Sequence, residues 1–145
     1  MPSKLRIAGV QPVPGMRALI IDWNNGKRHT VDLSTFLDQF PGLAPLKDAD
    51  LFEQAAVGEW GFDVVWGGEL EVAATTLHRL ALEQSGEVMP TRDFKQWMAK
   101  NNLSLSTAAA ELGFTRRTIT AYSSGAALIP KHVALACRGW EYEHR

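Results

Sequence analysis

Two adjacent arginines beside hydroxyl residues have the clearest capacity for chemistry in this sequence. Arg116 and Arg117 follow Thr115 directly, and Thr120 comes about one helical turn later. A guanidinium group can hold a phosphate or donate two hydrogen bonds to one guanine, and a threonine at a helix start can cap it. We therefore expect this segment to contact a nucleic acid. The candidate contact residues are Thr115, Arg116, Arg117, Thr120, Ser104 and Ser123.

Two short helices around a tight corner would position these side chains. Ser104 is a good N-cap for a helix over about 105–112, and Gly113 can take the positive φ of a helix end. Thr115 then caps a second helix, roughly 116–123, which Gly125 closes. A corner of about three residues is typical of a helix-turn-helix. The angle between the helices would be filled by small and apolar residues: Ala108, Ala109, Leu112, Ile119 and Tyr122. An ordinary helical corner with solvated arginines is the alternative.

The same stretch resembles the helix-turn-helix of the λ repressor/Cro-like (Xre) regulators over about 92–140. The resemblance rests on Leu103-Ser104, Ala109, Leu112-Gly113, the run 115–119, Tyr122 and Gly125. It implies a sequence-specific transcriptional regulator that binds double-stranded DNA as a homodimer on a palindromic site. The sequence departs from the family at two places. Leu105 stands where a glutamine is common, and Tyr122-Ser123 replaces the usual Trp-Glu.

Charge is distributed unevenly along the 145 residues, although the net charge is only −1. Residues 1–90 hold seven basic and twelve acidic side chains, a balance of −5, and residues 91–145 hold eight and four, a balance of +4. This asymmetry is expected when only the C-terminal half touches phosphate. An acidic first half also favours a second hypothesis, an antitoxin-like interaction module in which this half binds a basic protein partner.

The pattern of the N-terminal half predicts two groups of strands, separated by a short helix and followed by a longer one. We predict strands over 4–13, 17–23 and 27–33, with Asn25-Gly26 as a two-residue hairpin loop. This loop would pair Trp23 with Arg28, Asp22 with His29 and Ile20 with Val31. The pairing explains the Asp22–His29 neighbours without catalysis. Further predictions are a helix over 35–40, a loop over 43–50, strands over 51–57, 63–66 and 69–72 with a turn at Gly67-Gly68, and a helix from Thr75 or Thr76 to Ser85.

Apolar side chains on both faces of this hairpin suggest a second interface. Ile20 and Val31 would share one face, and Leu19, Ile21 and Trp23 the other. One small domain buries one face, so we predict that the other packs against a second subunit. Trp23, Trp60 and Trp66 could form a ligand cage, but aromatic filling of the core is the simpler interpretation. The half resembles a small uncharacterised bacterial domain family over about 5–82, through Asp22 to Gly26, Val31-Asp32-Leu33 and the run 65–70.

No catalytic constellation stands out, so we expect a protein that is not an enzyme and needs no cofactor. The four histidines are scattered and lack zinc-ligand spacing, and no nucleotide-binding glycine motif occurs. Single Cys137 excludes an intrachain disulfide and fits a reducing cytoplasm, and no apolar run approaches the roughly 20 residues of a membrane span. No signal peptide is recognisable.

The predicted fold class is α+β in two parts. A small α+β domain with antiparallel hairpins would cover 1–86, and an all-α λ-repressor-like helix-turn-helix domain would cover 90–145. Residues 87–90 would link them. Helices over 92–101 and 131–138 would complete the second domain, with Phe94, Trp97 and Met98 facing its core, joined by Val133, Ala134 and Cys137.

Overall fold

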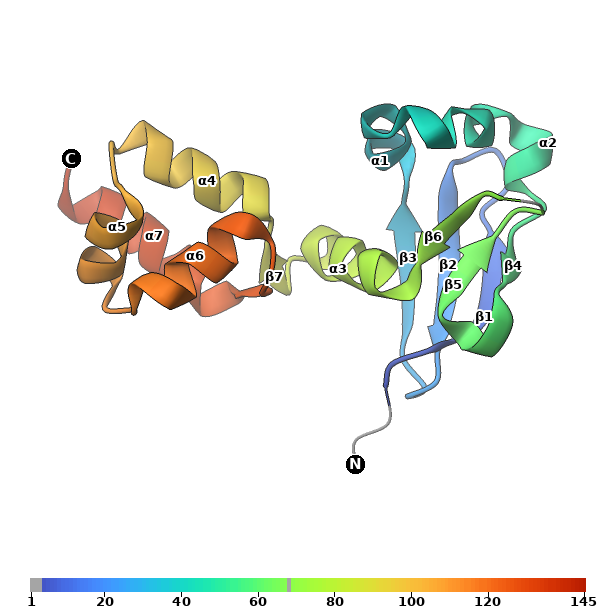
Figure 1. Cartoon of the computed structure of the whole chain (residues 1–145), viewed down its shortest axis with the longest axis horizontal. Helices are drawn as coiled ribbons and strands as arrows, with labels where there is room; N and C mark the ends of the chain where they lie inside the picture. Colours follow the sequence, from blue (N-terminus) through green and yellow to red (C-terminus); the bar gives the residue numbers. More distant parts are fainter. Residues whose placement is uncertain (1–3, 68) are drawn as a thin grey trace. The chain divides into compact units, whose positions relative to one another are not determined.

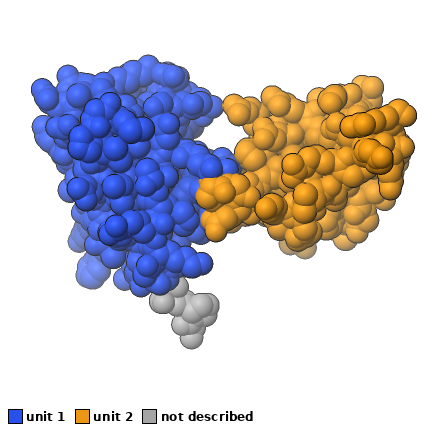
Figure 2. Space-filling model, turned by 180° about the vertical axis from the view of Figure 1, so that it is seen from behind, with its two compact units in different colours: residues 1–84 blue, residues 85–145 orange. Residues whose placement is uncertain are grey.

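A computed structural model describes residues 4–67 and 69–145 of the chain. Helices and antiparallel sheets make up the fold (Figure 1). The residues divide into two compact units, unit 1 over residues 1–84 and unit 2 over residues 85–145 (Figure 2). Each unit has a hydrophobic core of its own.

Two small antiparallel sheets form the strand part of unit 1. The first has the order β1-β2-β3, and its strands are β1 Ile7–Pro12, β2 Ala18–Trp23 and β3 Arg28–Asp32. The second has the order β4-β5-β6, and its strands are β4 Ala56–Val57, β5 Asp63–Val65 and β6 Glu71–Ala73. β1 contacts both β4 and β5, so the two sheets share one core. The predicted turn at Gly67-Gly68 lies partly outside the described residues, because Gly68 is not among them.

The helices of unit 1 are α1 Ser34–Gln39, the 3-10 helix η1 Pro41–Lys47, α2 Ala49–Phe52, the 3-10 helix η2 Glu59–Gly61, and α3 Ala74–Ser85. In Figure 1, α1, η1 and α2 gather at one end of the strands. The predicted loop over 43–50 and most of the predicted strand over 51–57 are therefore wrong. Asp48 starts a helix there, because its side chain accepts a hydrogen bond from the Leu51 amide at 3.0 Å. Helix α1 has no such cap: Leu33 stands at its N-cap position, and the Ser34 amide donates to the Asp32 carboxylate at 2.8 Å.

The hairpin between β2 and β3 has a register one residue away from the prediction. Its loop has three residues, and Gly26 takes a φ of 84° while the Trp23 amide bonds to the Lys27 carbonyl at 2.8 Å. A three-residue loop of this kind ends in a left-handed glycine bulge. The observed cross-strand partners are Asp22 with Arg28, Ile21 with His29, Ile20 with Thr30, Leu19 with Val31, and Ala18 with Asp32.

This register removes the predicted second apolar face. Val31 pairs with Leu19 and both are fully buried, together with Ile21 and Trp23. On the opposite face Ile20 is half-buried, and the neighbouring positions are polar. Asp22 there bonds to Arg28 at 2.6 Å and not to His29. The argument for a second subunit on this face therefore loses its basis.

The tryptophans of unit 1 divide between core and surface. Trp23 and Trp66 are buried, as core filling predicts, and Trp66 Nε1 donates to the Phe52 carbonyl at 2.9 Å. Trp60 is 70% exposed and holds a φ of 65°. Trp60 is therefore not part of the core, and the three tryptophans form no common cage.

Unit 2 has four helices, which are α4 Thr91–Lys100, α5 Leu105–Leu112, α6 Arg116–Ser124 and α7 Lys131–Glu143. Two short strands, β7 Val88–Met89 and β8 Ile129–Pro130, pair antiparallel. Residues 88–89 are thus paired backbone and not a free linker, and the unit is not purely helical. Backbone pairing of this kind depends on distant residues, so the local sequence does not reveal it.

The core of unit 2 follows the predicted pattern closely. Its buried members are Phe94, Trp97, Met98, Ala108, Ala109, Ile119, Tyr122, Ile129, Val133 and Cys137. Leu112 and Ala134 are half-buried. Trp140 packs edge-on against Trp97, with ring centroids 5.7 Å apart, and donates from Nε1 to Glu111 at 3.2 Å. These contacts tie α7 to α4 and α5, which holds the corner between α5 and α6 in place.

Candidate nucleic-acid interface

The corner between α5 and α6 is built by two N-caps and two left-handed glycines. Ser104 and Thr107 form a reciprocal capping box at the start of α5, in which Ser104 Oγ accepts from the Thr107 amide at 3.1 Å. Gly113 ends α5 with a φ of 78°, and Gly125 ends α6 with a φ of 82°. Thr115 caps α6 by accepting from the Thr118 amide at 3.2 Å. The predicted caps and ends of both helices are confirmed within one residue.

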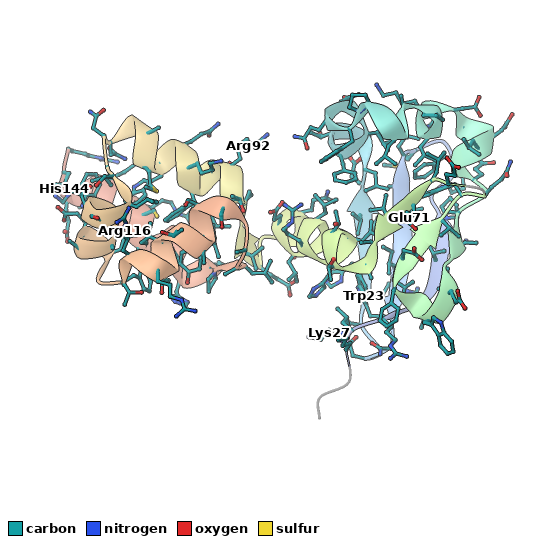
Figure 3. The ribbon with its side chains drawn as sticks, viewed as in Figure 1. Trp23, Lys27, Glu71, Arg92, Arg116 and His144 are labelled. Atoms are coloured by element: carbon teal, nitrogen blue, oxygen red, sulfur yellow. The ribbon has the colours of Figure 1, made fainter. Side chains whose placement is uncertain are left out.

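The arginines of α6 are exposed and available for a ligand. Arg116 and Arg117 occupy the first turn of the helix, and Figure 3 labels Arg116 on it. Neither side chain forms a hydrogen bond or ion pair with any residue that the structure describes. No carboxylate occurs anywhere in α6, so no acidic neighbour on the helix competes for them.

Two of the candidate hydroxyls on α6, those of Thr120 and Ser123, are bonded to their own helix. Thr120 Oγ1 donates to the Arg116 carbonyl at 2.9 Å, and Ser123 Oγ donates to the Thr120 carbonyl at 3.1 Å. Thr120 is exposed, whereas Ser123 is half-buried and lies nearer the core. Of the candidates on α6, Arg116, Arg117 and Thr120 therefore form one exposed surface, with Ser123 at its edge.

Sequence reasoning missed two members of this surface, Ala121 and Ser124. They stand four and seven residues after Arg117, which puts all three on one face of the helix. Ala121 is half-buried and Ser124 is exposed. The helical spacing from Arg117 was the signal that could have found them.

Ser104 and Thr115 have mainly structural roles. Their side-chain oxygens are occupied by the capping bonds, and Thr115 Oγ1 lies 3.0 Å from Thr118 Oγ1. The caps leave the first amides of each helix without intrahelical acceptors, as at every helix N-terminus. The positive end of the α6 dipole and the two arginines thus lie at the same place, which favours an anion there.

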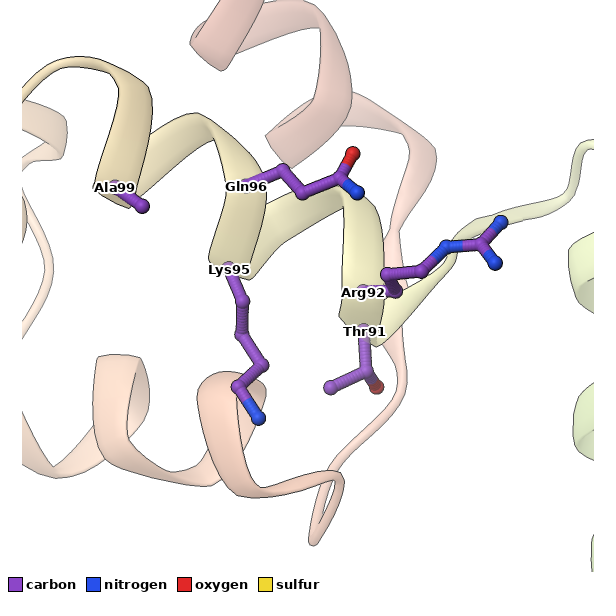
Figure 4. Close-up of a pocket in the computed structure, with 5 residues that line it drawn as sticks. All are labelled: Thr91, Arg92, Lys95, Gln96 and Ala99. Atoms are coloured by element: carbon purple, nitrogen blue, oxygen red, sulfur yellow. The ribbon is translucent and has the colours of Figure 1, made fainter. Parts of the chain in front are cut away.

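A second basic surface lies on α4. Arg92 and Lys95 project from the helix beside a shallow hollow of ≈ 500 Å³ that Thr91, Gln96 and Ala99 also line (Figure 4). These residues lie away from the buried side of α4, which carries Phe94, Trp97 and Met98. The lining of the hollow contains two cations and no carboxylate, but Arg92 Nε also lies 3.9 Å from Asp93 Oδ1 just outside it.

Other kinds of site have less support among the described residues. No group of three or more histidine, cysteine or carboxylate side chains lies close enough there to hold a metal ion. Burial raises the pKa of the Cys137 thiol to about 12, so the thiol is a poor nucleophile. In the part of the chain that the structure describes, no helix has the length and apolarity needed to cross a membrane.

Comparison with known proteins assigns unit 1 to a protein family. Residues 7–83, more than half of the chain, match the family DUF2442, described as proteins of unknown function. The chain belongs to this family. The expected resemblance of the first half to an uncharacterised domain family is confirmed, whereas the family match does not extend to unit 2. No curated protein matches this DUF2442 chain.

A solved structure extends the likeness to unit 2. It is the crystal structure of NE0471 from Nitrosomonas europaea, which is named as a proposed DNA binding protein. The two sequences are 35% identical, and the superposition covers 95% of this DUF2442 chain and 87% of the other with a TM-score of 0.57. Coverage this high includes residues of both units.

Proposed function

We propose that this DUF2442 chain is a sequence-specific DNA-binding transcriptional regulator of the Xre type, with unit 2 as its helix-turn-helix domain. The observation that carries the proposal is the first turn of α6, where two exposed arginines without partners among the described residues lie at a capped helix N-terminus. The likeness to a protein named for DNA binding supports it. So does the basic balance of residues 91–145.

In this mechanism α6 lies in the major groove and the corner follows the DNA backbone. Arg116 and Arg117 donate to guanine O6 and N7, each good pair contributing about 1–3 kcal/mol of discrimination. The free amides at the start of α6 hold a phosphate. One helix reads only a short half-site, so we propose a homodimer on a palindrome whose half-sites lie about one DNA turn apart.

Selection of binding sites from genomic DNA, followed by affinity measurements at two salt concentrations, tests the proposal. Arg117→Ala should relax the preference at one base pair and lower the slope of log affinity against log salt by about one at most. Arg138→Ala is the matched control, because it removes the same charge from an exposed position on α7. It should leave the base preferences unchanged. If Arg116→Ala and Arg117→Ala bind every sequence as tightly as the wild-type protein does, α6 is not the recognition helix.

We propose no enzymatic activity. The side chains of the candidate interface are arginines, hydroxyls and a half-buried alanine methyl. The hydroxyls of Thr120 and Ser123 are bonded to backbone carbonyls, without a neighbouring general base among the described residues. Such a surface binds a ligand better than it activates one. Turnover of a DNA or nucleotide substrate by the purified protein would contradict this.

A second candidate function, a protein-interaction module, has its own observation in unit 1. Trp60 and Phe62 are 70% and 44% exposed, and Arg6 lies over the Phe62 ring at 4.9 Å. Exposed Glu59 adjoins Trp60 in the sequence. The φ of 65° at Trp60 costs about 1–3 kcal/mol, and strain of this kind is concentrated at functional sites. Aromatics beside a carboxylate fit a partner segment with basic and apolar side chains.

This second candidate is tested by pull-down with the full-length protein. A specific partner that is captured by wild type and lost with Trp60→Ala supports it, and a small basic protein encoded beside the gene would be the first to examine. Glu53→Ala, an exposed change elsewhere in unit 1, is the control. Equal capture by wild type and Trp60→Ala would exclude this surface.

A further inference from the structure

The direction of the hydrogen bonds inside α6 is fixed by chemistry. Thr120 Oγ1 lies 2.9 Å from the Arg116 carbonyl oxygen. A carbonyl oxygen only accepts, so the threonine hydroxyl is the donor. Its single hydrogen is therefore used within the helix, while the lone pairs of the oxygen accept from no donor among the described residues. Thr120 is exposed on the surface that also carries Arg117 and Ala121.

The hydroxyls near the C-terminal end of α6 are less available to accept a hydrogen bond from a ligand. Ser123 Oγ donates to the Thr120 carbonyl at 3.1 Å and is half-buried. Ser124 Oγ donates to the Ala121 carbonyl at 3.3 Å and also accepts from the Ala126 amide at 3.3 Å. Of these three hydroxyls, that of Thr120 is thus the best placed to accept a hydrogen bond from a ligand.

We propose that Thr120 and Ala121 together read one A·T base pair next to the guanines held by the arginines. This inference rests on the proposed function and names the bases that the helix would select. A hydroxyl whose hydrogen is already bonded within the helix matches an exocyclic amino group, which in the major groove belongs to adenine N6 or cytosine N4. Guanine O6, guanine N7, thymine O4 and phosphate oxygens are acceptors, so they offer it no donor.

The methyl group of Ala121 favours adenine over cytosine as the contacted base. It is adjacent to Thr120 on the exposed side of α6, and its methyl group is only half-buried. The thymine paired to adenine carries a methyl group in the major groove, and alanine is one of the side chains that contact it. The guanine paired to cytosine has no such group. The two residues together therefore fit A·T better than C·G.

The test is a double-mutant cycle between protein and DNA on the site selected by the wild-type protein. The DNA change replaces the contacted adenine with purine, which lacks the N6 amino group. The protein change is Thr120→Val, which keeps the shape of threonine and removes its hydroxyl. Wild type should lose about 2- to 10-fold in affinity on the purine site, the value expected for one neutral hydrogen bond. Thr120→Val should bind the adenine and purine sites equally.

One further variant and a folding control keep the outcomes distinct. Thr120→Ser retains the hydroxyl and should keep the preference for adenine over purine, and thermal unfolding of each variant checks that α6 stays folded. Equal discrimination of adenine and purine by wild type and Thr120→Val overturns the inference. Selection of a site with no A·T pair beside the guanines also overturns it, while the proposed function stands. Absence of any preferred site for wild type contradicts the proposed function itself.

Discussion

Gly15 and Gly61 in unit 1 share a φ of 75° but differ in the space around them. A Cβ on Gly15 would meet nothing within 4 Å, whereas one on Gly61 would lie 2.5 Å from the Ile7 carbonyl oxygen. Gly15→Ala should therefore cost about 1–2 kcal/mol for the left-handed backbone alone. Gly61→Ala should cost clearly more, about 2–4 kcal/mol, because β1 must also move. Urea unfolding of both variants measures the difference, and equal losses would show that the contact with Ile7 is unimportant.

Glu71 on β6 gives a prediction about pH. Its hydrogen bond to Asp63, together with the charge of that carboxylate, raises its pKa above the ordinary value of 4.5. A raised pKa means that the folded protein binds the proton more tightly than the unfolded chain does. The contact therefore stabilises fully below the ordinary pKa and loses this effect as pH rises through the raised one.

Glu71→Gln should accordingly raise the melting temperature at neutral pH, because glutamine keeps a donor for Asp63 and removes the like charge. The gain should disappear below pH 4.5. Melting temperatures across the acid range measure it. Glu69→Gln, another exposed carboxylate nearby, is the control. A gain that is independent of pH would contradict this account.

At the scale of the element, α5 depends on its capping box. Ser104→Ala should lower the free energy of unfolding by about 1 kcal/mol, since it removes the acceptor for the Thr107 amide. Ser106→Ala is the matched control on the same helix, and it should be neutral or slightly stabilising because alanine is the better helix former. Chemical denaturation of the full chain distinguishes them. A larger effect at Ser106 would argue against the capping geometry.

Helix α7 contains a glycine that its packing does not require. A Cβ on Gly139 would meet nothing within 4 Å, and glycine inside a helix costs about 0.5–1 kcal/mol relative to alanine. Gly139→Ala should therefore stabilise unit 2 by that amount. Gly113→Ala has equally open space but a φ of 78°, so it should destabilise. Thermal melting with opposite shifts for the two variants would confirm that backbone conformation, and not crowding, decides the sign.

At the scale of the whole molecule, the two units have separate cores. Leu19→Ala removes a fully buried side chain from unit 1, and Ile119→Ala removes one from unit 2. Each should cost about 2–5 kcal/mol in its own unit. Hydrogen exchange of the full chain should show faster exchange confined to the unit that carries the change. Equal acceleration in both units would show that they unfold together.

Under the proposed function, DNA binding should depend on the core of unit 2 and not on the core of unit 1. Leu19→Ala should leave the affinity for the selected site unchanged at temperatures where unit 1 remains folded. Ile119→Ala should weaken binding, since Ile119 lies in the core beneath the exposed arginines of α6. A large loss of affinity with Leu19→Ala would mean that unit 1 takes part in DNA binding.

The helices of unit 2 were predictable because their signals are local. Ser104, Gly113, Thr115 and Gly125 mark starts and ends within a few residues of the chain, and a cap or a positive φ needs only its neighbours. The buried side chains follow from helical spacing in the same way. The uneven distribution of charge and the two arginines of the candidate interface are properties of the sequence itself.

What the tertiary structure decided involves residues far apart or choices between nearly equal local states. The register of β2 and β3 depends on whether the loop has two or three residues, and one residue of shift moved Val31 to the buried face with Leu19. The pairing of residues 88–89 with 129–130 joins segments that carry no local mark of contact. The hydrogen-bond directions of the hydroxyls on α6 also required atomic positions, because a sequence shows which residues carry a donor but not which acceptor each donor is bonded to.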